Sequence, residues 1–540
     1  MNINITLRKG NNTYNVTEIN NDIVKLKQEA NGNNFKLTLI ADEDIYLDSA
    51  VVSYDQKYSL NDLIFVNGYQ SWTDTFEYRI TKRLRNVEKL PKFLLNAYSF
   101  KMYGDAYFKK YKSTIRHGYD LGYIKGKHNL TIMNANVKNT YLIINFDLLH
   151  GKVILEADVK GFRIKKGEEY TLFNYYYVRK TLSELAVNEG VFNLKTNDKI
   201  FGYTSWYNHY QDINEKIVSD CLESLDSRFN LFQIDDGYET FVGDWLDIDK
   251  NKFPNGLKGL VDKAHNKGFK AGIWLAPFVA ETKSKLFKDH PDWFHKDEKN
   301  KPIKCGSNWS GFYALNLKLK EVRDYIEKSL NYYIDLGFDF FKLDFLYASS
   351  VKPDEDNTRA MITAKAYGFL RRVLKDKLIL GCGASIMSSA GVFDYMRIGP
   401  DVSLKFDDIW YMKFMHRERI STKVTIQNTI YRSVLDHRLF LNDPDVFLLR
   451  DDNIELSKAQ RLALITINAL FGSVLMTSDN IKEYDEEKNE ILNNAFDIFN
   501  NAKNKKYSKD GKYIHISYDL HDKHIKYKYD TLKGVLLNDR

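Results

Sequence analysis

From residue 199 onward, short apolar runs alternate with stretches of helical periodicity, and this alternation constrains the fold more than any other feature. Between the runs, residues 256–266, 317–336 and 360–374 repeat apolar side chains three and four positions apart, which predicts helices. Eight apolar runs qualify as strands: 200–206, 231–236, 270–275, 340–347, 378–382, 395–398, 438–441 and 473–476. Eight strands with interleaved helices predict an α/β fold, a (β/α)8 TIM barrel over residues 193–502. An open doubly wound sheet would carry a glycine-rich phosphate turn after its first strand, and the sequence has none there.

The segments on either side of the predicted barrel have the two-residue periodicity of β-strands. Within residues 1–192, runs such as 35–40, 141–146 and 153–157 are separated by Asn, Gly and Asp clusters, which is typical of an antiparallel β-sandwich domain. Residues 181–189 are expected to form a linker helix, and residues 503–540 a small C-terminal β region. Trp72 ends a loop-like Gly/Asn-rich segment, where a tryptophan is more often a loop anchor than a platform for a ligand.

Composition and charge exclude several classes of protein. The 540 residues are 44% hydrophobic and 28% charged, which indicates an ordinary globular protein of two or three domains. The net charge of +7 comes from 79 basic and 72 acidic residues mixed along the chain, without a nucleic-acid-binding signature, so no nucleic-acid partner is expected. The apolar stretch 462–476 is too short and too polar to span a membrane, and the first residues do not resemble a signal peptide. Three cysteines without CxxC spacing favour a reducing, cytoplasmic location.

The run 340–347 contains the most informative pair of charges, Lys342 and Asp344. The two residues are two positions apart, so on a strand their side chains point to the same face. Burying an ion costs several kcal/mol unless it is paired or used in function. The pair is therefore either a structural ion pair or part of an active site, and this run alone leaves both interpretations open.

Reactive side chains gather at the ends of the predicted strands, which is where a (β/α)8 barrel places its active site. The candidates are Trp206, Tyr207, Asp235, Asp236, Trp274, Lys342, Asp344, Cys382, Arg397 and Asp401. Several carboxyl groups with tryptophans form the inventory of a glycoside hydrolase, in which two carboxyl groups share the work of breaking the glycosidic bond. No metal site is expected, because the calcium-like start at Asp247 lacks the glycine and glutamate that such a loop needs. Cys382 has no histidine near it in sequence, so a buried cysteine at a strand end is the default interpretation.

Eight motifs occur along the predicted barrel in a fixed order. They are DDGY (235–238), GDW (243–245), FPNG (253–256), GIWLAPF (272–278), HPDW (290–293), KLDFL (342–346), MRIGPD (396–401) and LNDPD (441–445). Together they resemble the α-galactosidases, or melibiases, of glycoside hydrolase family 36. The likeness spans at least residues 202–450, and the family also carries a β-rich N-terminal domain.

The resemblance implies a role for each candidate residue. Asp344 matches the catalytic nucleophile that forms a covalent glycosyl-enzyme, and Asp401 matches the general acid/base. Asp235 and Asp236 match the pair that holds hydroxyls on the far side of the galactose ring. The rest of the pocket wall is matched by Lys342, Trp274, Trp206, Tyr207 and Arg397. Trp72 matches a tryptophan of the N-terminal domain that reaches over the site in some members of the family. This tryptophan can come from a neighbouring subunit, so the resemblance is compatible with a homo-oligomer.

The implied activity is that of a retaining exo-α-galactosidase acting on terminal α-D-galactosyl groups of oligosaccharides of the melibiose and raffinose type, without cofactor or metal. One loop departs from the family pattern, because residues 380–385, which include Cys382, replace the Glu-x-Cys-x-Gly-Gly-Gly sequence of some branches. In the family this loop contacts the sugar 2-position, which separates galactose from N-acetylgalactosamine, so the resemblance leaves both sugars open as substrates here. A transglycosylase of the raffinose-synthase type and a non-catalytic galactoside-binding protein also stay open as functions. A non-catalytic protein would be expected to lack one of the carboxylates, and none is missing.

The resemblance also allows two physical expectations. Lys342 beside Asp344 should lower the pKa of the nucleophile, since an opposite charge favours the ionised form. In a retaining glycosidase, the two catalytic carboxyl groups should lie about 5–5.5 Å apart.

Overall fold

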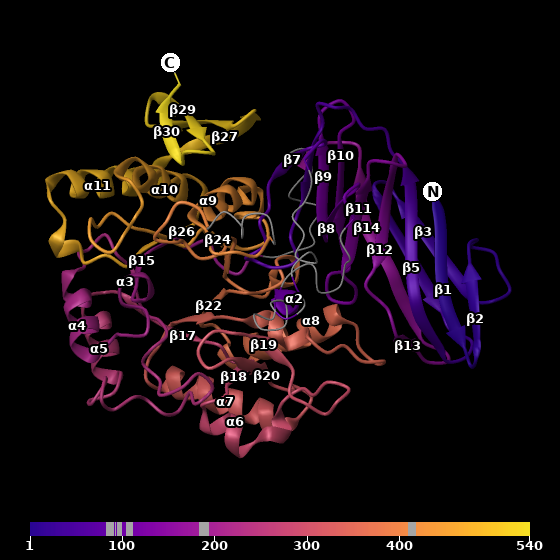
Figure 1. Ribbon diagram of the computed structural model, residues 1–540, viewed down its shortest axis with the longest axis horizontal. Helices are drawn as coiled ribbons and strands as arrows, with labels where there is room; N and C mark the ends of the chain where they lie inside the picture. The colour runs from indigo at the N-terminus through magenta and orange to yellow at the C-terminus, as the bar shows by residue number, and fades with distance from the viewer. Residues whose placement is uncertain are drawn as a thin grey trace.

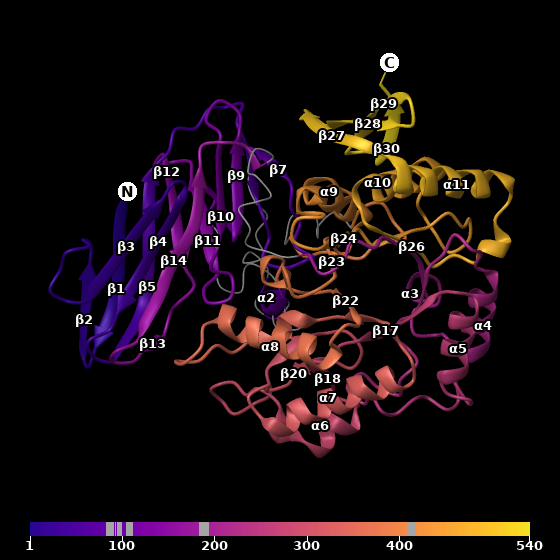
Figure 2. The same cartoon turned by 180° about the vertical axis from the view of Figure 1, so that it is seen from behind.

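The structure is a computed structural model that describes residues 1–82, 91, 93, 100–103, 112–182, 194–408 and 417–539. It consists of a β-sandwich, a (β/α)8 barrel and a small C-terminal sheet that lies against the barrel (Figures 1 and 2). The predicted linker helix at 181–189 lies outside the described residues except for its first two residues. The proposed domain boundary at residue 192 also lies outside them. None of the described helices is both long enough and apolar enough to cross a bilayer.

The N-terminal part consists of two antiparallel sheets of seven strands each, as the sequence predicts. One sheet contains β1 (Asn2–Lys9), β2 (Asn12–Val16), β5 (Ile45–Asp55), β8 (Ile115–Tyr119), β11 (Leu142–Asp147), β12 (Lys152–Ala157) and β13 (Phe162–Ile164). The other contains β3 (Lys25–Asn31), β4 (Asn34–Ile40), β6 (Leu63–Val66), β7 (Glu77–Arg79), β9 (Leu121–Lys125), β10 (Leu130–Asn134) and β14 (Glu169–Val178). In β1, Ile3, Ile5 and Leu7 are buried while their neighbours are more exposed, which is the period of two of a strand with one covered face. The short helix α2 (Phe100–Tyr103) belongs to the same part of the chain.

The barrel is a single parallel sheet whose two ends meet in one interrupted strand. Its strands are β15 (Ile200–Thr204), β16 (Leu231–Ile234), β17 (Lys270–Leu275), β21 (Phe340–Leu343), β22 (Leu378–Gly381), β23 (Tyr395–Arg397), β24 (Leu441–Asp443), β25 (Val446–Phe447) and β26 (Val474–Thr477). β24 pairs with β23 and β25 pairs with β26, so the two short strands act as the seventh barrel strand with a break at Pro444 and Asp445. All residues of β15, β16 and β21 are buried, because helices cover the outer face and side chains fill the interior. The predicted TIM barrel is therefore confirmed.

Helices follow most of the barrel strands. The α-helices are α3 (Trp206–His209), α4 (Glu215–Ser224), α5 (Lys258–Asn266), α6 (Lys285–Asp289), α7 (Lys320–Asp335), α8 (Arg359–Leu374), α9 (Thr422–Tyr431), α10 (Lys458–Phe471) and α11 (Glu486–Asn501). The 3₁₀ helices are η4 (Pro291–Trp293), η5 (Leu346–Ser350), η6 (Met387–Ser389), η8 (Ser433–Leu435) and η9 (Ile481–Glu483). The helices expected at 256–266, 317–336 and 360–374 correspond to α5, α7 and α8. Thr358 caps α8 by accepting a hydrogen bond from the Met361 backbone N–H, which sets the start of that helix.

Three strands that the sequence did not reveal form a small antiparallel sheet between β17 and α7. They are β18 (Val279–Glu281), β19 (Lys304–Gly306) and β20 (Phe312–Ala314). Strands of three residues are too short to show a periodicity, which explains why this insertion was missed. The C-terminal region forms the expected antiparallel sheet, with strands β27 (Lys503–Asp510), β28 (Tyr513–Leu520), β29 (Lys523–Asp530) and β30 (Val535–Asn538).

Candidate active site

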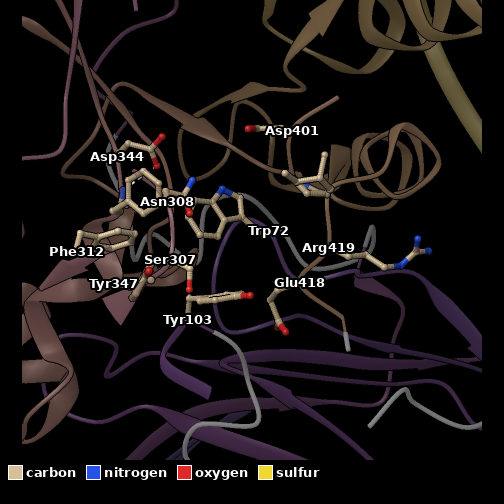
Figure 3. A pocket seen from close by; sticks show the side chains of 14 residues that line it. Trp72, Tyr103, Ser307, Asn308, Phe312, Asp344, Tyr347, Asp401, Glu418 and Arg419 are labelled. Atoms are coloured by element: carbon tan, nitrogen blue, oxygen red, sulfur yellow. Dashed lines mark hydrogen bonds between the residues drawn. The ribbon is translucent and has the colours of Figure 1, made fainter. Parts of the chain in front are cut away.

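A cavity of about 200 Å³ opens at the C-terminal ends of the barrel strands, where the loop between β6 and β7 of the sandwich meets the barrel (Figure 3). Its wall combines segments that are far apart in the sequence. The lining residues are Trp72, Tyr103, Gly306, Ser307, Asn308, Phe312, Asp344, Phe345, Tyr347, Pro400, Asp401, Glu418, Arg419 and Ile420. Among the predicted site residues, Trp72, Asp344 and Asp401 belong to this wall.

Asp344 directly follows β21 and is held by hydrogen bonds to both carboxylate oxygens. Trp274 Nε1 donates to Asp344 Oδ2 at 3.3 Å, and the backbone N–H of Phe345 donates to Oδ1 at 2.7 Å. Phe345 has a φ of 53°, which is uncommon for a bulky residue and marks a sharp turn at this position. Burial raises the pKa of Asp344, the positive charge of Lys342 opposes this effect, and the negative charge of Asp401 adds to it. Asp344 thus interacts electrostatically with a second carboxyl group of the same cavity.

Asp401 lies on the other side of the cavity from Asp344 and is the more accessible of the two, with 34% of its side chain exposed (Figure 3). Arg397 Nη1 lies 3.1 Å from Asp401 Oδ1. The same guanidinium also contacts the two aspartates that flank the break in the seventh strand, at 2.8 Å from Asp443 Oδ2 and 2.8 Å from Asp445 Oδ1. Burial acts to lower the pKa of Arg397, but the neighbouring carboxylates outweigh it and raise that pKa well above the usual value. Arg397 is therefore a permanent cation, fixed beside Asp401 by three carboxylates.

Lys342 is bonded to Asp235 and not to Asp344. Its Nζ lies 2.8 Å from Asp235 Oδ2, an oxygen that also accepts hydrogen bonds from Thr204 Oγ1 at 3.1 Å and Gln233 Nε2 at 2.7 Å. The expected effect of Lys342 on the pKa of Asp344 is present, but it does not decide the net shift. The charge of Lys342 lowers the pKa of Asp344, but burial has the larger effect and the net shift is upward. The physical reason is that Asp235 neutralises much of the lysine charge, while Asp344 bears the full cost of desolvation.

Asp236 lies beside Asp235 and is part of a second group of polar contacts. Trp309 Nε1 donates to Asp236 Oδ2 at 2.8 Å, and Gln211 Nε2 lies within 3.2 Å of both its carboxylate oxygens. Burial raises the pKa of Asp236. Burial also raises the pKa of the neighbouring Glu239 well above its usual value, and the charge and hydrogen bonding of Asp236 raise it further. Two carboxyl groups in contact cannot both ionise easily, and the larger upward shift of the pKa falls on Glu239, so a proton in this pair favours Glu239 over Asp236.

Trp72 forms part of the cavity wall in its own chain. Its ring packs edge-on against Phe345 and Tyr347, with ring centroids 5.3 and 5.8 Å apart. The loop that carries Trp72 is fastened to the barrel by Arg432, whose Nη1 donates to the Ser71 carbonyl at 2.7 Å. Figure 3 shows the indole between the segments that carry Asp344 and Asp401. The position of Trp72 therefore goes beyond that of a loop anchor.

The other predicted site residues lie next to the cavity wall or beneath it. Tyr207 is buried, and its hydroxyl donates to Asp445 Oδ2, so it supports the carboxylates around Arg397. Trp206 is half-buried and packs edge-on against Tyr210, with ring centroids 5.2 Å apart. Cys382 is buried, and its side chain lies close enough to Asp344 to interact with that carboxyl group. All three cysteines of the chain are free and buried.

Several residues of the site were not identified from the sequence. Ser307, Asn308 and Trp309 come from the loop between β19 and β20, and Trp309 has a φ of 55°, a second strained backbone position at the site. Tyr103 and Glu418 reach the cavity from segments with no motif of their own. One signal in the sequence was the aspartate pair in LNDPD, since Asp443 and Asp445 both contact Arg397. The remaining residues depend on long-range packing that the sequence does not show.

The arrangement can perform acid–base and nucleophilic chemistry with its own side chains. Among the described ranges, no three His, Cys, Asp or Glu side chains are grouped as metal ligands would be. Two carboxyl groups on different sides of one cavity, with indole groups close by, are what the cleavage of a glycosidic bond needs.

Comparisons with known proteins agree with this geometry. Residues 187–370 match the Melibiase family. α-Galactosidase Mel36A of Lactobacillus acidophilus is 31% identical to this chain over 188 residues. The matched segment covers 31% of this chain and 25% of the relative, so the chain spans about a quarter of that protein's length. TtGalA, an α-galactosidase from Thermus thermophilus, superposes with a TM-score of 0.71 at 21% identity, covering 92% of this chain and 95% of the other. The family 36 α-galactosidase AgaA from Geobacillus stearothermophilus has a TM-score of 0.64 at 13% identity, covering 94% and 72%. The resemblance to family 36 α-galactosidases is therefore confirmed, and the structural likeness extends over the whole architecture.

Proposed function

We propose that this chain, which carries the Melibiase match over residues 187–370, is a retaining exo-α-galactosidase. Its substrates are the terminal non-reducing α-D-galactosyl groups of oligosaccharides of the melibiose and raffinose type. The observation that carries the proposal is the placement of Asp344 and Asp401 on different sides of one cavity at the C-terminal end of a (β/α)8 barrel. Names of the relatives support the same activity, since the Lactobacillus and Thermus proteins are both called α-galactosidases.

In the first step, the ionised Asp344 attacks the anomeric carbon of the galactosyl group from the β face. The glycosidic bond breaks as Asp401 gives its proton to the leaving oxygen, and a covalent β-galactosyl ester of Asp344 forms. The hydrogen bonds from Trp274 Nε1 and the Phe345 N–H fix the orientation of the attacking carboxylate. In the second step, Asp401 takes a proton from a water molecule, which attacks the same carbon, releases Asp344 and retains the α configuration of galactose.

The charged residues beneath the cavity recognise the sugar in this proposal. Asp235 and Asp236 accept hydrogen bonds from galactose hydroxyls, while Lys342 and Arg397 supply donors and keep the nearby carboxylates ionised. The faces of Trp274, Trp206 and Trp72, the Tyr207 ring and the Cys382 side chain complete the substrate-binding set. The mechanism uses only carboxyl groups and water, so no cofactor or metal is part of it.

The state of Asp344 gives the proposal a pH dependence. Because burial raises the pKa of Asp344, the nucleophile ionises at a higher pH than a solvent-exposed aspartate does. Activity requires the ionised form, so kcat/KM falls as the pH decreases through this raised pKa.

The identity of the sugar is tested by comparing p-nitrophenyl α-galactoside with p-nitrophenyl α-N-acetylgalactosaminide. Cys382 lies in the loop that replaces the family's usual contact to the sugar 2-position, and its thiol adjoins Asp344. We expect the galactoside to be the better substrate. A preference for the acetylated sugar would replace the proposed activity with that of an α-N-acetylgalactosaminidase. Binding of galactose without turnover of either glycoside would indicate a non-catalytic galactoside-binding protein.

The nucleophile is tested by Asp344→Ala. We expect kcat to fall by at least about 10⁴-fold, since a retaining glycosidase without its nucleophile has no route to the covalent intermediate. The matched control is Asp262→Ala, which removes an exposed aspartate of α5 whose partner is the exposed Lys258. A variant at residue 344 within about tenfold of wild type would refute the mechanism.

The acid/base is tested by Asp401→Ala with and without azide. Activated aryl galactosides should lose less activity than natural oligosaccharides, because their leaving groups need no proton. Added azide should attack the β-linked intermediate and yield α-galactosyl azide. Equal losses for both substrate types, with no azide product, would remove Asp401 from this role.

Three further statements belong to the proposal. The protein acts in the cytoplasm, and its three free cysteines are consistent with a reducing compartment. Trp72 completes the site within one chain, so a homo-oligomer is not needed for catalysis. Enzyme diluted until light scattering detects only the monomer should therefore keep its activity. The catalytic barrel occupies residues 193–502, between a sandwich domain over 1–192 and a β region over 503–540.

A further inference from the structure

A second cavity lies between the start of α7, the end of η5 and one face of α8. Helices α7 and α8 are neighbours in the barrel (Figure 1). Its volume is about 500 Å³, within the range of roughly 300–1,000 Å³ that small-molecule sites occupy. None of the residues that line it lines the active-site cavity. The proposed hydrolysis therefore leaves this cavity without a role.

Five cationic side chains line the second cavity: Lys318, Arg323, Lys352, Lys365 and Arg372. In the described part of the chain, only Lys318 forms an ion pair, with Asp354. The other four have no carboxylate partner there. Lys352 and Lys365 donate to uncharged oxygens, the Lys296 carbonyl and the Asn357 side chain. The excess of positive charge around one hollow is thus uncompensated by the described residues.

Helix α8 accounts for much of this excess. Its sixteen residues, Arg359–Leu374, include four basic residues and no aspartate or glutamate. Arg359 and Arg371 pair with Asp158 and Asp394 of other segments, which leaves Lys365 and Arg372 on the face that lines the cavity. Solvated helix surfaces usually mix both signs of charge, because like charges on one face repel each other. Two cations without a carboxylate partner among the described residues, on the one helix face that borders a cavity, are instead suited to attracting an anion.

His295 supplies the independent observation that this cavity is a binding site. The side chain lines the cavity and is only 9% exposed, yet the described residues offer its ring nitrogens no hydrogen-bond partner. Burial lowers the pKa of His295 to about 4, and the charges of Lys352 and Lys318 lower it further in the same direction. The imidazole is therefore neutral near pH 7 and presents one free donor and one free acceptor. The ring nitrogens of His295 are not among the fully buried, unpartnered atoms of the described residues, so they are accessible from the cavity and can pair with a ligand there.

The remaining wall is apolar and open. Leu317, Ile362 and Phe369 contribute hydrocarbon surface, and Gly368 leaves free space, since a Cβ built there would meet nothing within 4 Å. A bare phosphate ion would contact only part of such a wall. The combination of cations, a neutral imidazole and apolar surface fits an anion attached to an organic body.

We propose that the cavity between α7, η5 and α8 binds a small organic phosphate. Arg323, Lys365 and Arg372 supply charge-assisted hydrogen bonds to the phosphate oxygens, His295 pairs with a polar group of the ligand, and the apolar wall contacts its organic part. This function is separate from galactoside hydrolysis.

Isothermal titration calorimetry of the full chain at low salt tests the proposal with AMP and glucose 6-phosphate as probes. Adenosine and glucose are the matched uncharged controls, and inorganic phosphate is the control for the anion alone. We expect one site per chain for at least one ester, with a Kd at or below about 1 mM, and no binding of the uncharged partner. The assay contains no galactoside, so its outcome does not depend on the proposed hydrolysis.

The variant Lys365→Gln/Arg372→Gln removes two exposed cations of α8 without touching the core. We expect it to weaken ester binding by at least about tenfold, which corresponds to ~1.4 kcal/mol. The control is Lys328→Gln, which removes an exposed lysine of α7 that does not line the cavity. The proposal is overturned if no ester binds by about 1 mM, if the double variant binds as tightly as wild type, or if inorganic phosphate binds as tightly as both esters.

Discussion

Replacing Lys342 with methionine separates two effects that the structure assigns to this lysine. Lys342 and Asp235 are both buried, with 6% and 3% of their side chains exposed and 2.8 Å between Nζ and Oδ2. Breaking a buried pair by removing one partner costs about 3–5 kcal/mol. Asp235 Oδ2 keeps its hydrogen bonds from Thr204 and Gln233, so the loss should be near the lower limit, about 3 kcal/mol. For a barrel of this size we expect a decrease in Tm of roughly 5–10 °C by scanning calorimetry.

The same substitution should change the pH profile. The charge of Lys342 lowers the pKa of Asp344 against the effect of burial, so its removal raises that pKa further. The acid limb of kcat/KM follows the ionisation of the nucleophile in the free enzyme, so the limb moves to higher pH and activity is lost first at the acid end. An unmoved limb, or one that moves to lower pH, would show that Lys342 does not help to keep Asp344 ionised.

Two controls separate the stability effect from the pH effect. Lys342→Met/Asp235→Asn removes both charges and should recover most of the lost stability, since no unpaired buried ion remains. Lys377→Met breaks a lysine–aspartate pair at the opposite end of the barrel strands, where Nζ lies 3.5 Å from Asp339 Oδ1 and both side chains are partly exposed. It should cost less than about 1 kcal/mol and leave the pH profile unchanged. A loss in Lys377→Met as large as in Lys342→Met would refute the assignment of the cost to burial.

Two further substitutions probe buried carboxyl groups behind the cavity. Asp445→Ala leaves the Tyr207 hydroxyl and the Val402 N–H without their acceptor. Because residue 402 directly follows the proposed acid/base, we expect kcat to fall by roughly 100-fold with little change in KM. An unchanged kcat would show that this contact does not position the catalytic segment. Glu239→Gln should keep activity within about threefold in steady-state assays, because the neutral amide can still donate to Asp236 as the protonated acid does. Glu239→Ala has no such donor and should lose activity by at least about tenfold. Equal losses in both variants would mean that Glu239 acts as an ion.

The sequence predicted the barrel because its strands are buried on both faces and therefore appear as continuous apolar runs. Residues 340–343 and 378–381 are strands in the structure close to where the runs predict them. The seventh strand was predicted about three residues too early, because Pro444 interrupts it and leaves two short pieces without a recognisable run. The small sheet between β17 and α7 was not predicted, since pairing of three-residue strands depends on partners that are distant in sequence.

The motifs located the carboxyl groups of the site, but not their partners. A carboxylate at the end of a barrel strand is predictable, because the fold fixes where strand ends meet. The assignment of Lys342 to Asp235 was not predictable, because it depends on how neighbouring strands are staggered: Trp274 is in register with Lys342, and Gln233 with Gly272. Trp309 and its bond to Asp236 were missed for a similar reason, since the inserted loop has no periodic pattern that would place it over the cavity.

Gly383 links the sandwich to the catalytic barrel by close packing, and Gly383→Ala tests whether that packing positions Trp72. A Cβ at this residue would lie 2.9 Å from Trp72 Cζ2, closer than real Cβ atoms come to another heavy atom, and 3.0 Å from the Phe345 backbone nitrogen, which is tighter than nearly all real Cβ contacts. The indole can move and the backbone cannot easily do so, so the substitution should displace Trp72 from the cavity. We expect KM for raffinose to rise by about tenfold, as for Trp72→Ala, and the double variant to be little worse than either single one. Gly268→Ala is the matched control, because its φ of 81° brings a similar backbone strain of about 1–2 kcal/mol while its Cβ would meet nothing within 4 Å. If Gly268→Ala and Gly383→Ala change KM equally, or if the effects of Gly383→Ala and Trp72→Ala simply add, the displaced indole is not the cause.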